Sequence, residues 1–328
     1  MNKPRFSIIT PLHNKGPYIT ETIASVQSQT FSHWQLIIVE NHSSDDGPLQ
    51  VERAAAADAR ISLVHAPKDV RGPAAARNIG LALARGDWIL FLDADDILDS
   101  RYLDQMNRMQ SLTPEAVVIT SPWVEFRNDI LSSEKVIKYP VGFLNNGIGV
   151  QELAIAFTCW AVHAAIIRRS WLSERKWPEE LDGYLAEDTA FWFRVVSGAR
   201  IAYSEFPGAY YRTHTECCRT NLSADSWFEG NHHAVLSNLE WLRSHHQSPS
   251  NAQVLMLVRL YESLYERAEF LANNRIVEEA LKLANVWLSR LPNKQTIKSP
   301  SMTLRKLFGI RTFCRLKKSL FLITRGHA

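Results

Sequence analysis

The fold of this chain is decided by the stretch WILFLDADD, residues 88–96. We interpret it as a β-strand that leads directly into three carboxylates within four positions, Asp93, Asp95 and Asp96. Like charges this close repel one another and raise one another's pKa unless something positive lies between them. Mg²⁺ or Mn²⁺ is the usual neutraliser, because it takes one or two carboxylates together with substrate phosphates. The stretch therefore predicts a metal site at a strand end; the alternative is an acidic loop that only caps a following helix.

Strand and helix signals alternate through the first hundred residues around this stretch. Short apolar runs predict strands, and apolar residues at helical spacing predict helices. The expected strands cover residues 6–10, 35–39, 61–65 and 88–92, and the expected helices cover residues 17–29, 48–57 and 74–84. This alternation predicts an α/β fold with right-handed crossovers and a doubly wound, mostly parallel sheet. Ligands of such sheets bind beyond the carboxyl ends of the strands, where the three carboxylates lie.

The composition is that of a globular protein with a sizeable core. Hydrophobic residues make up 46% of the 328 residues and charged residues 22%, so a disordered chain is not expected. The four cysteines show no metal-type spacing, and the adjacent Cys217 and Cys218 cannot readily pair, which indicates a reducing compartment. No signal-peptide segment precedes the first strand, and the longest apolar stretch, residues 153–167, is too short to span a bilayer. We therefore expect a cytoplasmic protein.

The pattern changes to helix alone from about residue 226. Three helices are expected over residues 227–245, 251–271 and 275–291. We therefore expect a sheet domain over residues 1–224 and a C-terminal helical region over residues 225–328.

The end of the helical region is strongly basic. Between Arg290 and the C-terminus there are ten basic residues and no acid, so the rest of the chain is net acidic. The apolar side chains of residues 310–321 fall on one side of a helical wheel, which suits an anionic membrane surface. We expect the tail to hold the protein on the inner face of the membrane, unless the basic helix packs on the protein itself. Nucleic acid is not an expected partner, because no binding module is present.

No glycine-rich phosphate cradle is present in the sequence. The stretch GPAAARN, residues 72–78, lacks the spacing of a P-loop, and no G-x-G-x-x-G follows the first strand. A nucleotide bound by this chain must therefore be held by a metal and by side chains.

Four blocks of the sequence together resemble the family 2 glycosyltransferases. They are SIITP at residues 7–11 with Asn14, IIVENHSSD at 37–45, GPAAARN at 72–78 and FLDADD at 91–96. The resemblance implies the A-type nucleotide-sugar transferase (GT-A) fold, with residues 1–224 as the catalytic domain. It further implies an inverting, metal-dependent transferase of the hexosyltransferase type. Such an enzyme moves a sugar from a nucleotide-diphosphate donor, here a UDP-sugar, to a hydroxyl of a glycan or lipid-linked acceptor in cell-surface polysaccharide synthesis.

The resemblance also implies roles for residues on the donor side. Asp93 matches the acid that faces the donor ribose, and Asp95 matches the ligand of the divalent metal, Mn²⁺ or Mg²⁺. Thr10 matches a nucleobase contact at the end of the first strand. Glu40 matches a contact to the base or ribose, but this chain has Glu-Asn-His where the family usually has Asp-Asp-Gly, so the base stays open. Arg77 matches an arginine near the nucleotide; a surface ion pair is its alternative.

On the acceptor side the resemblance points to Glu187 and Asp188. Asp188 matches the general base that takes the proton from the acceptor hydroxyl, and Glu187 supports it or contacts the acceptor. As an alternative, both acids only favour the start of a helix, where the macrodipole attracts negative charge. His214 matches a histidine that reaches the metal or the diphosphate; the alternative is a hydrogen-bonded structural residue.

Two other functions are compatible with parts of the pattern. A sugar-phosphate nucleotidyltransferase also uses a metal and a doubly wound sheet, but it should carry a Gly-rich loop with Arg or Lys after the first strand, and residues 11–16 match this poorly. A non-catalytic glycan- or nucleotide-binding protein could keep the same fold, but the set Asp93, Asp95 and Asp188 argues against it. The donor sugar, the acceptor, the linkage and the oligomeric state are left open by the sequence.

Overall fold

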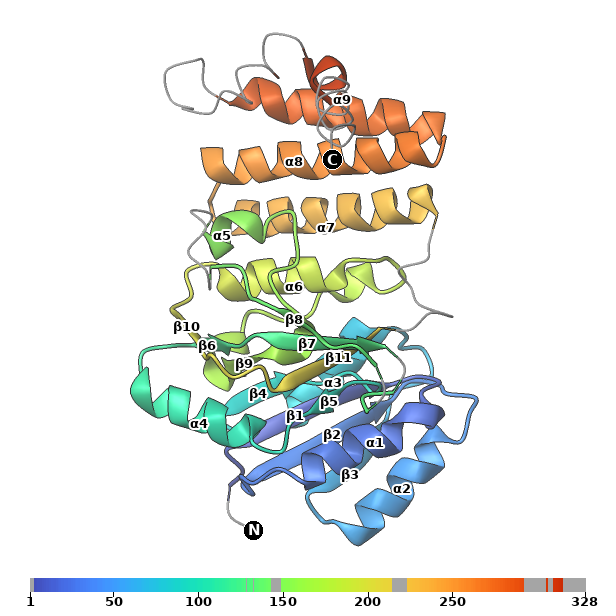
Figure 1. The fold of residues 1–328 in the computed structure, drawn as a ribbon, viewed down its shortest axis with the longest axis vertical. Coiled ribbons are helices and arrows are strands. Elements are labelled where there is room, and N and C mark those ends of the chain that lie inside the picture. Colours follow the sequence, from blue (N-terminus) through green and yellow to red (C-terminus); the bar gives the residue numbers. More distant parts are fainter. Residues whose placement is uncertain are drawn as a thin grey trace. The chain divides into compact units, whose positions relative to one another are not determined.

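The computed structural model describes residues 3–127, 129–131, 133–142, 149–213, 223–291, 305 and 309–314. The chain divides into two compact units (Figure 1). The sheet unit lies within residues 1–154, 158–183 and 187–221, and the helical unit lies within residues 155–157, 184–186 and 222–328.

Strands and helices alternate through the first part of the sheet unit, as the sequence predicts. Its elements are β1 (Phe6–Leu12), α1 (Gly16–Gln27), β2 (Trp34–Glu40), α2 (Gly47–Ala57), β3 (Ile61–His65), α3 (Pro73–Leu83) and β4 (Trp88–Phe91). The second part is more irregular. It contains β5 (Ile97–Leu98), α4 (Tyr102–Leu112), β6 (Val118–Thr120), β7 (Trp123–Arg127), β8 (Val136–Lys138), α5 (Val150–Leu153), β9 (Ala165–Arg168), α6 (Glu187–Val196), β10 (Ile201–Tyr203) and β11 (Ala209–Thr213), with short 3₁₀ turns η1 (Val162–Ala164), η2 (Arg169–Leu172) and η3 (Glu179–Leu181).

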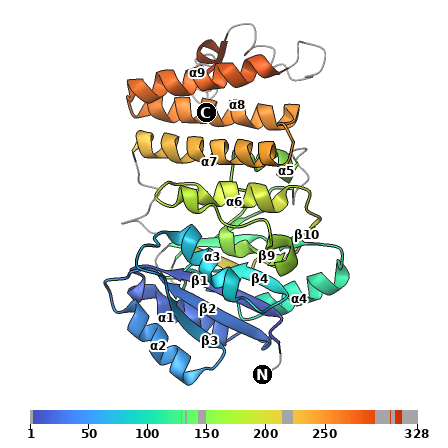
Figure 2. The same ribbon diagram turned by 180° about the vertical axis from the view of Figure 1, so that it is seen from behind.

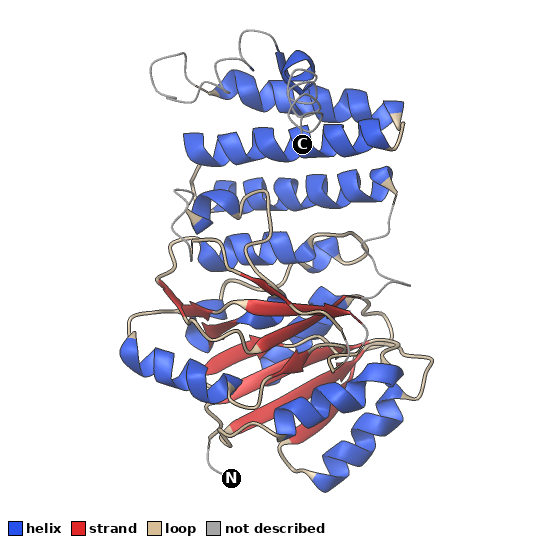
Figure 3. Ribbon diagram, viewed as in Figure 1, coloured by secondary structure: helices blue, strands red, loops and turns tan. Residues whose placement is uncertain are grey.

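The main sheet has seven strands in the order β10-β6-β9-β4-β1-β2-β3. Figure 3 draws the strands in red and the helices in blue. β1 pairs in parallel with β2 and β4, and β2 pairs in parallel with β3. β1 and β2 are almost wholly buried, which is typical of strands covered on both faces. α3 packs on β1 and β2, as the view from behind shows (Figure 2). The predicted doubly wound, mostly parallel sheet is confirmed. Only β9 is antiparallel among these seven strands, and the sequence did not predict it.

A second, smaller sheet supports the segment that follows the three carboxylates. Its order is β5-β11-β7-β8, with β11 antiparallel to β5 and parallel to β7. β5 begins at Ile97, directly after Asp96, so this sheet fixes the chain on the C-terminal side of the carboxylates.

The helical unit contains α7 (Ala224–Ser244), α8 (Asn251–Phe270) and α9 (Asn274–Arg290). These bounds agree closely with the three predicted helices. Each helix begins after a side chain that accepts a hydrogen bond from the helix's first turn, which marks its start. Ser223, Ser250 and Asn273 are these caps, and Ser250 forms a full capping box with Gln253. No helix of the described ranges is both long enough and apolar enough to span a bilayer.

Beyond α9 the structure describes Arg305 and residues 309–314 of the basic tail. Ile310 and Cys314 are buried, and Arg305 and Arg311 each pair with a glutamate of the helical unit. For these residues the structure agrees with the alternative that the tail packs on the protein. The rest of the tail, including most of the predicted amphipathic helix, lies outside the described residues.

Candidate active site

The carboxyl ends of β1, β2 and β4 bring the predicted donor-side residues to one edge of the sheet. Thr10 of β1 pairs with Ile38 of β2, Glu40 ends β2, and Asp93 follows the end of β4 by two residues. Ligands of open α/β sheets bind at this edge. Thr10 is fully buried, and its hydroxyl has no hydrogen-bond partner among the described residues.

Arg77 of α3 is a buried cation that joins the two predicted halves of the site. Its Nη2 donates to Asp93 Oδ1 at 2.7 Å, and its Nη1 lies 3.7 Å from Glu187 Oε1. The guanidinium lies over the ring of Trp177, 4.2 Å from its centroid, and Trp177 stacks on Phe191 of α6. Arg77 is 2% exposed, so the alternative of a surface ion pair is wrong. Asp93 is partly exposed, so the buried pair is the one with Glu187, and removing one partner of a buried pair is destabilising by about 3–5 kcal/mol.

Asp182 holds the start of α3, the helix that carries Arg77. Its two carboxylate oxygens accept hydrogen bonds from the backbone N–H groups of Ala74 and Ala75, both at 2.8 Å. The residue before the helix is Gly72, with φ +99°, and an added Cβ would lie 2.2 Å from the Asp182 carboxylate carbon. Burial raises the pKa of Asp182 above its ordinary value, although the two amides oppose this. Asp182 therefore acts as the N-cap that Gly72 cannot supply.

Two long side chains fix the turn that carries Asp95. Lys15 Nζ, at the start of α1, lies 2.5 Å from Asp95 Oδ2. Arg212 Nε of β11 donates to the Asp95 carbonyl at 2.8 Å. The Thr22 hydroxyl lies 3.0 Å and 2.9 Å from the carbonyl oxygens of Ala94 and Asp96. The turn is therefore held from α1 on one side and from β11 on the other.

Asp96, the third carboxylate, points into the protein. Its Oδ2 lies 3.0 Å from Nδ1 of the buried His163, and its Oδ1 accepts from the Arg212 backbone N–H at 2.8 Å. Burial raises the pKa of Asp96, although His163 opposes this, and Asp96 in turn holds the pKa of His163 above its ordinary value against the effect of burial. Asp96 is thus a structural acid and is not available to a ligand.

The three clustered carboxylates therefore each have a basic partner within the protein. Arg77 pairs with Asp93, Lys15 with Asp95 and His163 with Asp96; the sequence interpretation of one shared cation missed all three. No signal in the local sequence connects these residues.

The described residues contain no cluster of three His, Cys, Asp or Glu side chains that could hold a metal by itself. The predicted ligand His214 lies outside the described residues. Asp93 and Asp95 keep 30% and 14% of their side chains exposed. This pair fits a cation that shares its ligands with a substrate diphosphate, because Mg²⁺ is usually held by one or two carboxylates plus phosphates. Lys15 would have to leave Asp95 for such a cation to bind there.

Glu40 is held as an ionised acceptor by its own turn. It accepts hydrogen bonds from the Ser43 backbone N–H and from His65 Nδ1. Burial works against ionisation, but these bonds outweigh it and hold the pKa of Glu40 below its ordinary value. His42 has φ +62°, so it takes a left-handed conformation where the family usually has glycine. Asn41 donates to the Gly72 carbonyl at 2.8 Å and so ties the end of β2 to the start of α3.

Glu187 and Asp188 form the first turn of α6. The Asp188 carboxylate accepts from the Thr189 backbone N–H at 2.8 Å and from the Thr158 hydroxyl at 3.2 Å. Burial, together with the charge of Glu187, raises the pKa of Asp188 to about 6. This value suits a general base at neutral pH, whereas the bond to Thr189 also fits the alternative of a helix start.

Residues 7–175, more than half of the chain, match the family model described as Glycosyl transferase family 2. The chain therefore belongs to this family. The matches to two of the first curated relatives cover 44% and 62% of those proteins' own lengths.

Three similar proteins illustrate the match. The Escherichia coli protein named UDP-Glc:alpha-D-GlcNAc-diphosphoundecaprenol beta-1,3-glucosyltransferase WfgD is 37% identical over 103 residues, which are 31% of this chain and 40% of that protein. S. aureus TarS 1-349 in complex with UDP superposes with a TM-score of 0.58 at 19% identity over 97% of this chain and 91% of that one. The mannosyltransferase PcManGT from Pyrobaculum calidifontis, in complex with GDP-Man and Mn²⁺, superposes with a TM-score of 0.56 at 17% identity. The match covers 98% of this chain and 86% of that one. The structural likenesses confirm the predicted GT-A fold.

Proposed function

We propose that this chain is an inverting, metal-dependent glycosyltransferase that uses a UDP-sugar and a glycan or lipid-linked hydroxyl acceptor. The observation that carries the proposal is Arg77, which joins the donor-side Asp93 to Glu187, the residue beside the candidate base Asp188. Family membership supports sugar transfer, and the UDP bound to TarS together with the name of the E. coli relative supports a UDP-sugar.

On the donor side the charged side chains are already held in place by other residues of the chain. Arg77 fixes the Asp93 carboxylate, so that its second oxygen can accept from a ribose hydroxyl. Asp95 would hold the divalent cation together with the donor diphosphate, with His214 as a further expected ligand. When bound, that cation offsets the negative charge that develops on the leaving nucleoside diphosphate. Lys15, released from Asp95, can contact the same phosphates as a point charge.

On the acceptor side Asp188 takes the proton of the attacking hydroxyl. The acceptor oxygen forms its bond to the sugar C1 on the face opposite the leaving diphosphate, and the proton moves to an Asp188 carboxylate oxygen. The Thr158 hydroxyl and the Thr189 backbone N–H orient this carboxylate. Because its pKa is about 6, the carboxylate is mostly ionised at neutral pH and still basic enough to accept the proton.

A donor screen tests the proposal. UDP-, GDP- and dTDP-sugars are supplied with Mn²⁺ or with EDTA, and free nucleoside diphosphate is measured with and without acceptor. We expect release from a UDP-sugar that requires Mn²⁺. Binding of a donor by calorimetry without release under any acceptor condition would support the non-catalytic binding protein. Pyrophosphate release from a nucleoside triphosphate and a sugar phosphate would support the nucleotidyltransferase.

Asp182→Ala is expected to weaken UDP binding, although Asp182 is not among the residues expected to contact the nucleotide or the metal. Loss of an N-cap lowers the free energy of unfolding by about 1 kcal/mol. If UDP binding must restore the position of Arg77 at this same cost, UDP affinity falls about fivefold. Ser250→Ala is the control, because it removes the cap of α8 in the helical unit and should reduce stability without changing UDP affinity. Equal UDP affinities for the two variants would show that the start of α3 has no part in donor binding.

A further inference from the structure

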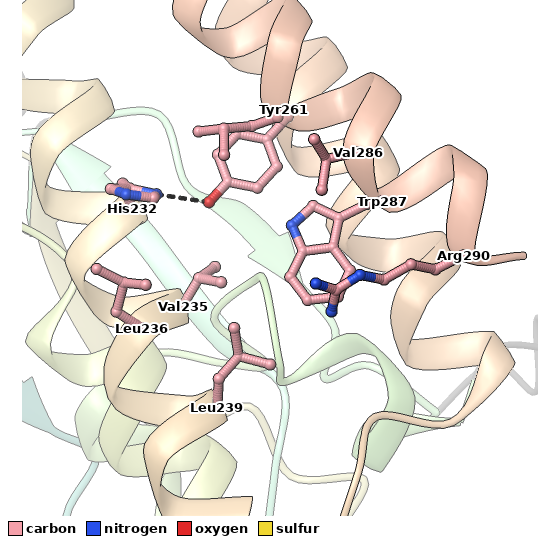
Figure 4. Close-up of a pocket in the computed structure, with 9 residues that line it drawn as sticks. His232, Val235, Leu236, Leu239, Tyr261, Val286, Trp287 and Arg290 are labelled. Carbon is pink, nitrogen blue, oxygen red and sulfur yellow. Dashed lines mark hydrogen bonds between the residues drawn. The ribbon is translucent and has the colours of Figure 1, made fainter.

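The helical unit contains an apolar pocket of about 350 Å³ lined by α7, α8 and α9 (Figure 4). Seven of its nine lining residues are aliphatic or aromatic: Val235, Leu236, Leu239, Tyr261, Leu283, Val286 and Trp287. The other two are His232 and Arg290. Binding pockets for small molecules have this size and this balance of many apolar groups with a few polar ones.

Two of the polar groups in the pocket are hydrogen-bonded to each other, and the third is a cation that could bind an anionic ligand. His232 Nδ1 lies 2.7 Å from the Tyr261 hydroxyl, so these two groups satisfy each other (Figure 4). Arg290 is the last residue of α9, and its guanidinium lies 4.3 Å from the centroid of the Trp287 ring. No acidic side chain of the described ranges pairs with Arg290, whereas Arg275 of the same helix pairs with Asp225. A guanidinium in this position can bind a phosphate group.

The rim of the pocket is formed by apolar side chains that are exposed to water. Leu236 of α7 is 46% exposed, and Val286 of α9 is 41% exposed. An aliphatic chain that enters the pocket would contact apolar side chains of all three helices. Burying such a chain removes apolar surface from water on both partners, which is favourable.

We propose that this pocket binds the polyprenyl chain of a lipid-linked acceptor, with the phosphate of that lipid at Arg290. The inference rests on the proposed function, because it names the acceptor class of the same reaction. An aliphatic chain with an anionic head matches both the apolar lining and the adjacent guanidinium. A nucleotide or a free sugar would need many more polar partners than this lining offers. The diphosphoundecaprenol in the name of the E. coli relative is an acceptor of this chemical class.

The test uses the full chain and a short prenyl phosphate. Farnesyl phosphate binding is measured by calorimetry for the wild type, for Val286→Trp, which fills the pocket from its rim, and for Arg290→Gln. We expect each change to weaken binding by about tenfold or more, the loss typical of a blocked pocket or of a removed charge-assisted hydrogen bond. Farnesol should bind the wild type about as weakly as farnesyl phosphate binds Arg290→Gln, and inorganic phosphate alone should show no saturable binding.

Two matched variants are the controls. Leu271→Trp adds the same side chain at a position that is 46% exposed and outside the pocket, and Arg259→Gln removes an exposed charge of α8 outside it. Both should bind farnesyl phosphate like the wild type, and thermal unfolding verifies that all four variants are folded. Equal weakening in Val286→Trp and Leu271→Trp, or no weakening in either, would overturn the assignment.

A further measurement separates the lipid carrier from the bilayer itself. If sedimentation with phosphatidylglycerol vesicles depended on Val286 and Arg290 as strongly as farnesyl phosphate binding does, the pocket would be a bilayer contact and the acceptor assignment would be wrong. Failure of the proposed function would look different. No nucleoside diphosphate would be released from any donor, while farnesyl phosphate binding would still depend on both residues.

Discussion

Asp188→Asn is expected to lower the rate of sugar transfer by about 10²–10⁴-fold while donor affinity stays near that of the wild type. The amide keeps the size and polarity of the carboxylate, but it cannot take a proton from the acceptor hydroxyl at neutral pH. Among the described residues the Asp188 carboxylate accepts hydrogen bonds from Thr158 and Thr189 and forms none with Arg77, which pairs with Asp93, so the donor side should be undisturbed. Single-turnover transfer and calorimetric UDP binding measure the two quantities separately.

The pH dependence of transfer provides a second readout of the same residue. Because burial and Glu187 raise the pKa of Asp188 to about 6, its protonated, inactive form dominates below that pH. Wild-type transfer should therefore rise with pH through about 6 and then level off, and the residual activity of Asp188→Asn should lack this rise. Glu187→Gln removes the charge that contributes to the high pKa, so its profile should move to lower pH. If Asp188→Asn kept near wild-type turnover at saturating acceptor, Asp188 would only begin α6.

The parallel core of the sheet was predictable because its signals are local. β1 and β2 are buried at almost every position, and the helices that follow them have apolar residues at regular spacing, so a short window of sequence contains each element. The same is true of the helical unit, where Ser250 and Gln253 mark the start of α8 within four residues. Order along the chain then gives the crossovers, since right-handed connections leave few alternatives.

The second sheet and β9 were not predictable for the opposite reason. β5 has two residues and β9 has four, so neither offers enough positions for a period to be recognised. Both are defined by pairing with distant strands, and β9 runs antiparallel between β4 and β6.

The candidate site also has one part that the sequence predicts and another part that it does not. The acids and Arg77 could be named from the sequence because each belongs to a short block, whereas Asp182, Lys15 and His163, which hold them in place, could not. Asp182 is 108 residues from Ala74, and Lys15 is 80 residues from Asp95. Such pairs are created by the fold alone, and a single sequence contains no spacing that indicates them. For this reason the sequence interpretation assigned the neutralising charge to a metal and did not pair the three carboxylates with Arg77, Lys15 and His163.

Asp95→Ala is expected to abolish the metal-dependent part of donor binding. A hard cation that bridges a diphosphate cannot be held by a methyl group, and Asp93 alone is already engaged with Arg77. Changes to groups that merely support metal ligands typically lower metal affinity by about 10–100-fold, so loss of a ligand should reach at least the upper end of that range. Calorimetry of UDP with Mn²⁺ and with EDTA measures the effect. The wild type should lose affinity in EDTA, whereas Asp95→Ala should show the low affinity in both buffers.

Asp99→Ala and Lys15→Met test whether this effect belongs to the Asp95 carboxylate. Asp99 lies four residues further along, is similarly shielded and pairs with Arg101, so its removal should leave Mn²⁺-dependent UDP binding intact. Lys15→Met removes the cation that occupies Asp95 at 2.5 Å, so Mn²⁺ alone, followed by electron paramagnetic resonance, should bind this variant more tightly than the wild type. A metal and Lys15 compete for the Asp95 carboxylate in this scheme, and Asp95→Ala and Lys15→Met must therefore shift Mn²⁺ affinity in opposite directions. UDP affinity that is unchanged by both Asp95→Ala and EDTA would instead mean that Lys15 and Arg77 hold the diphosphate without a metal.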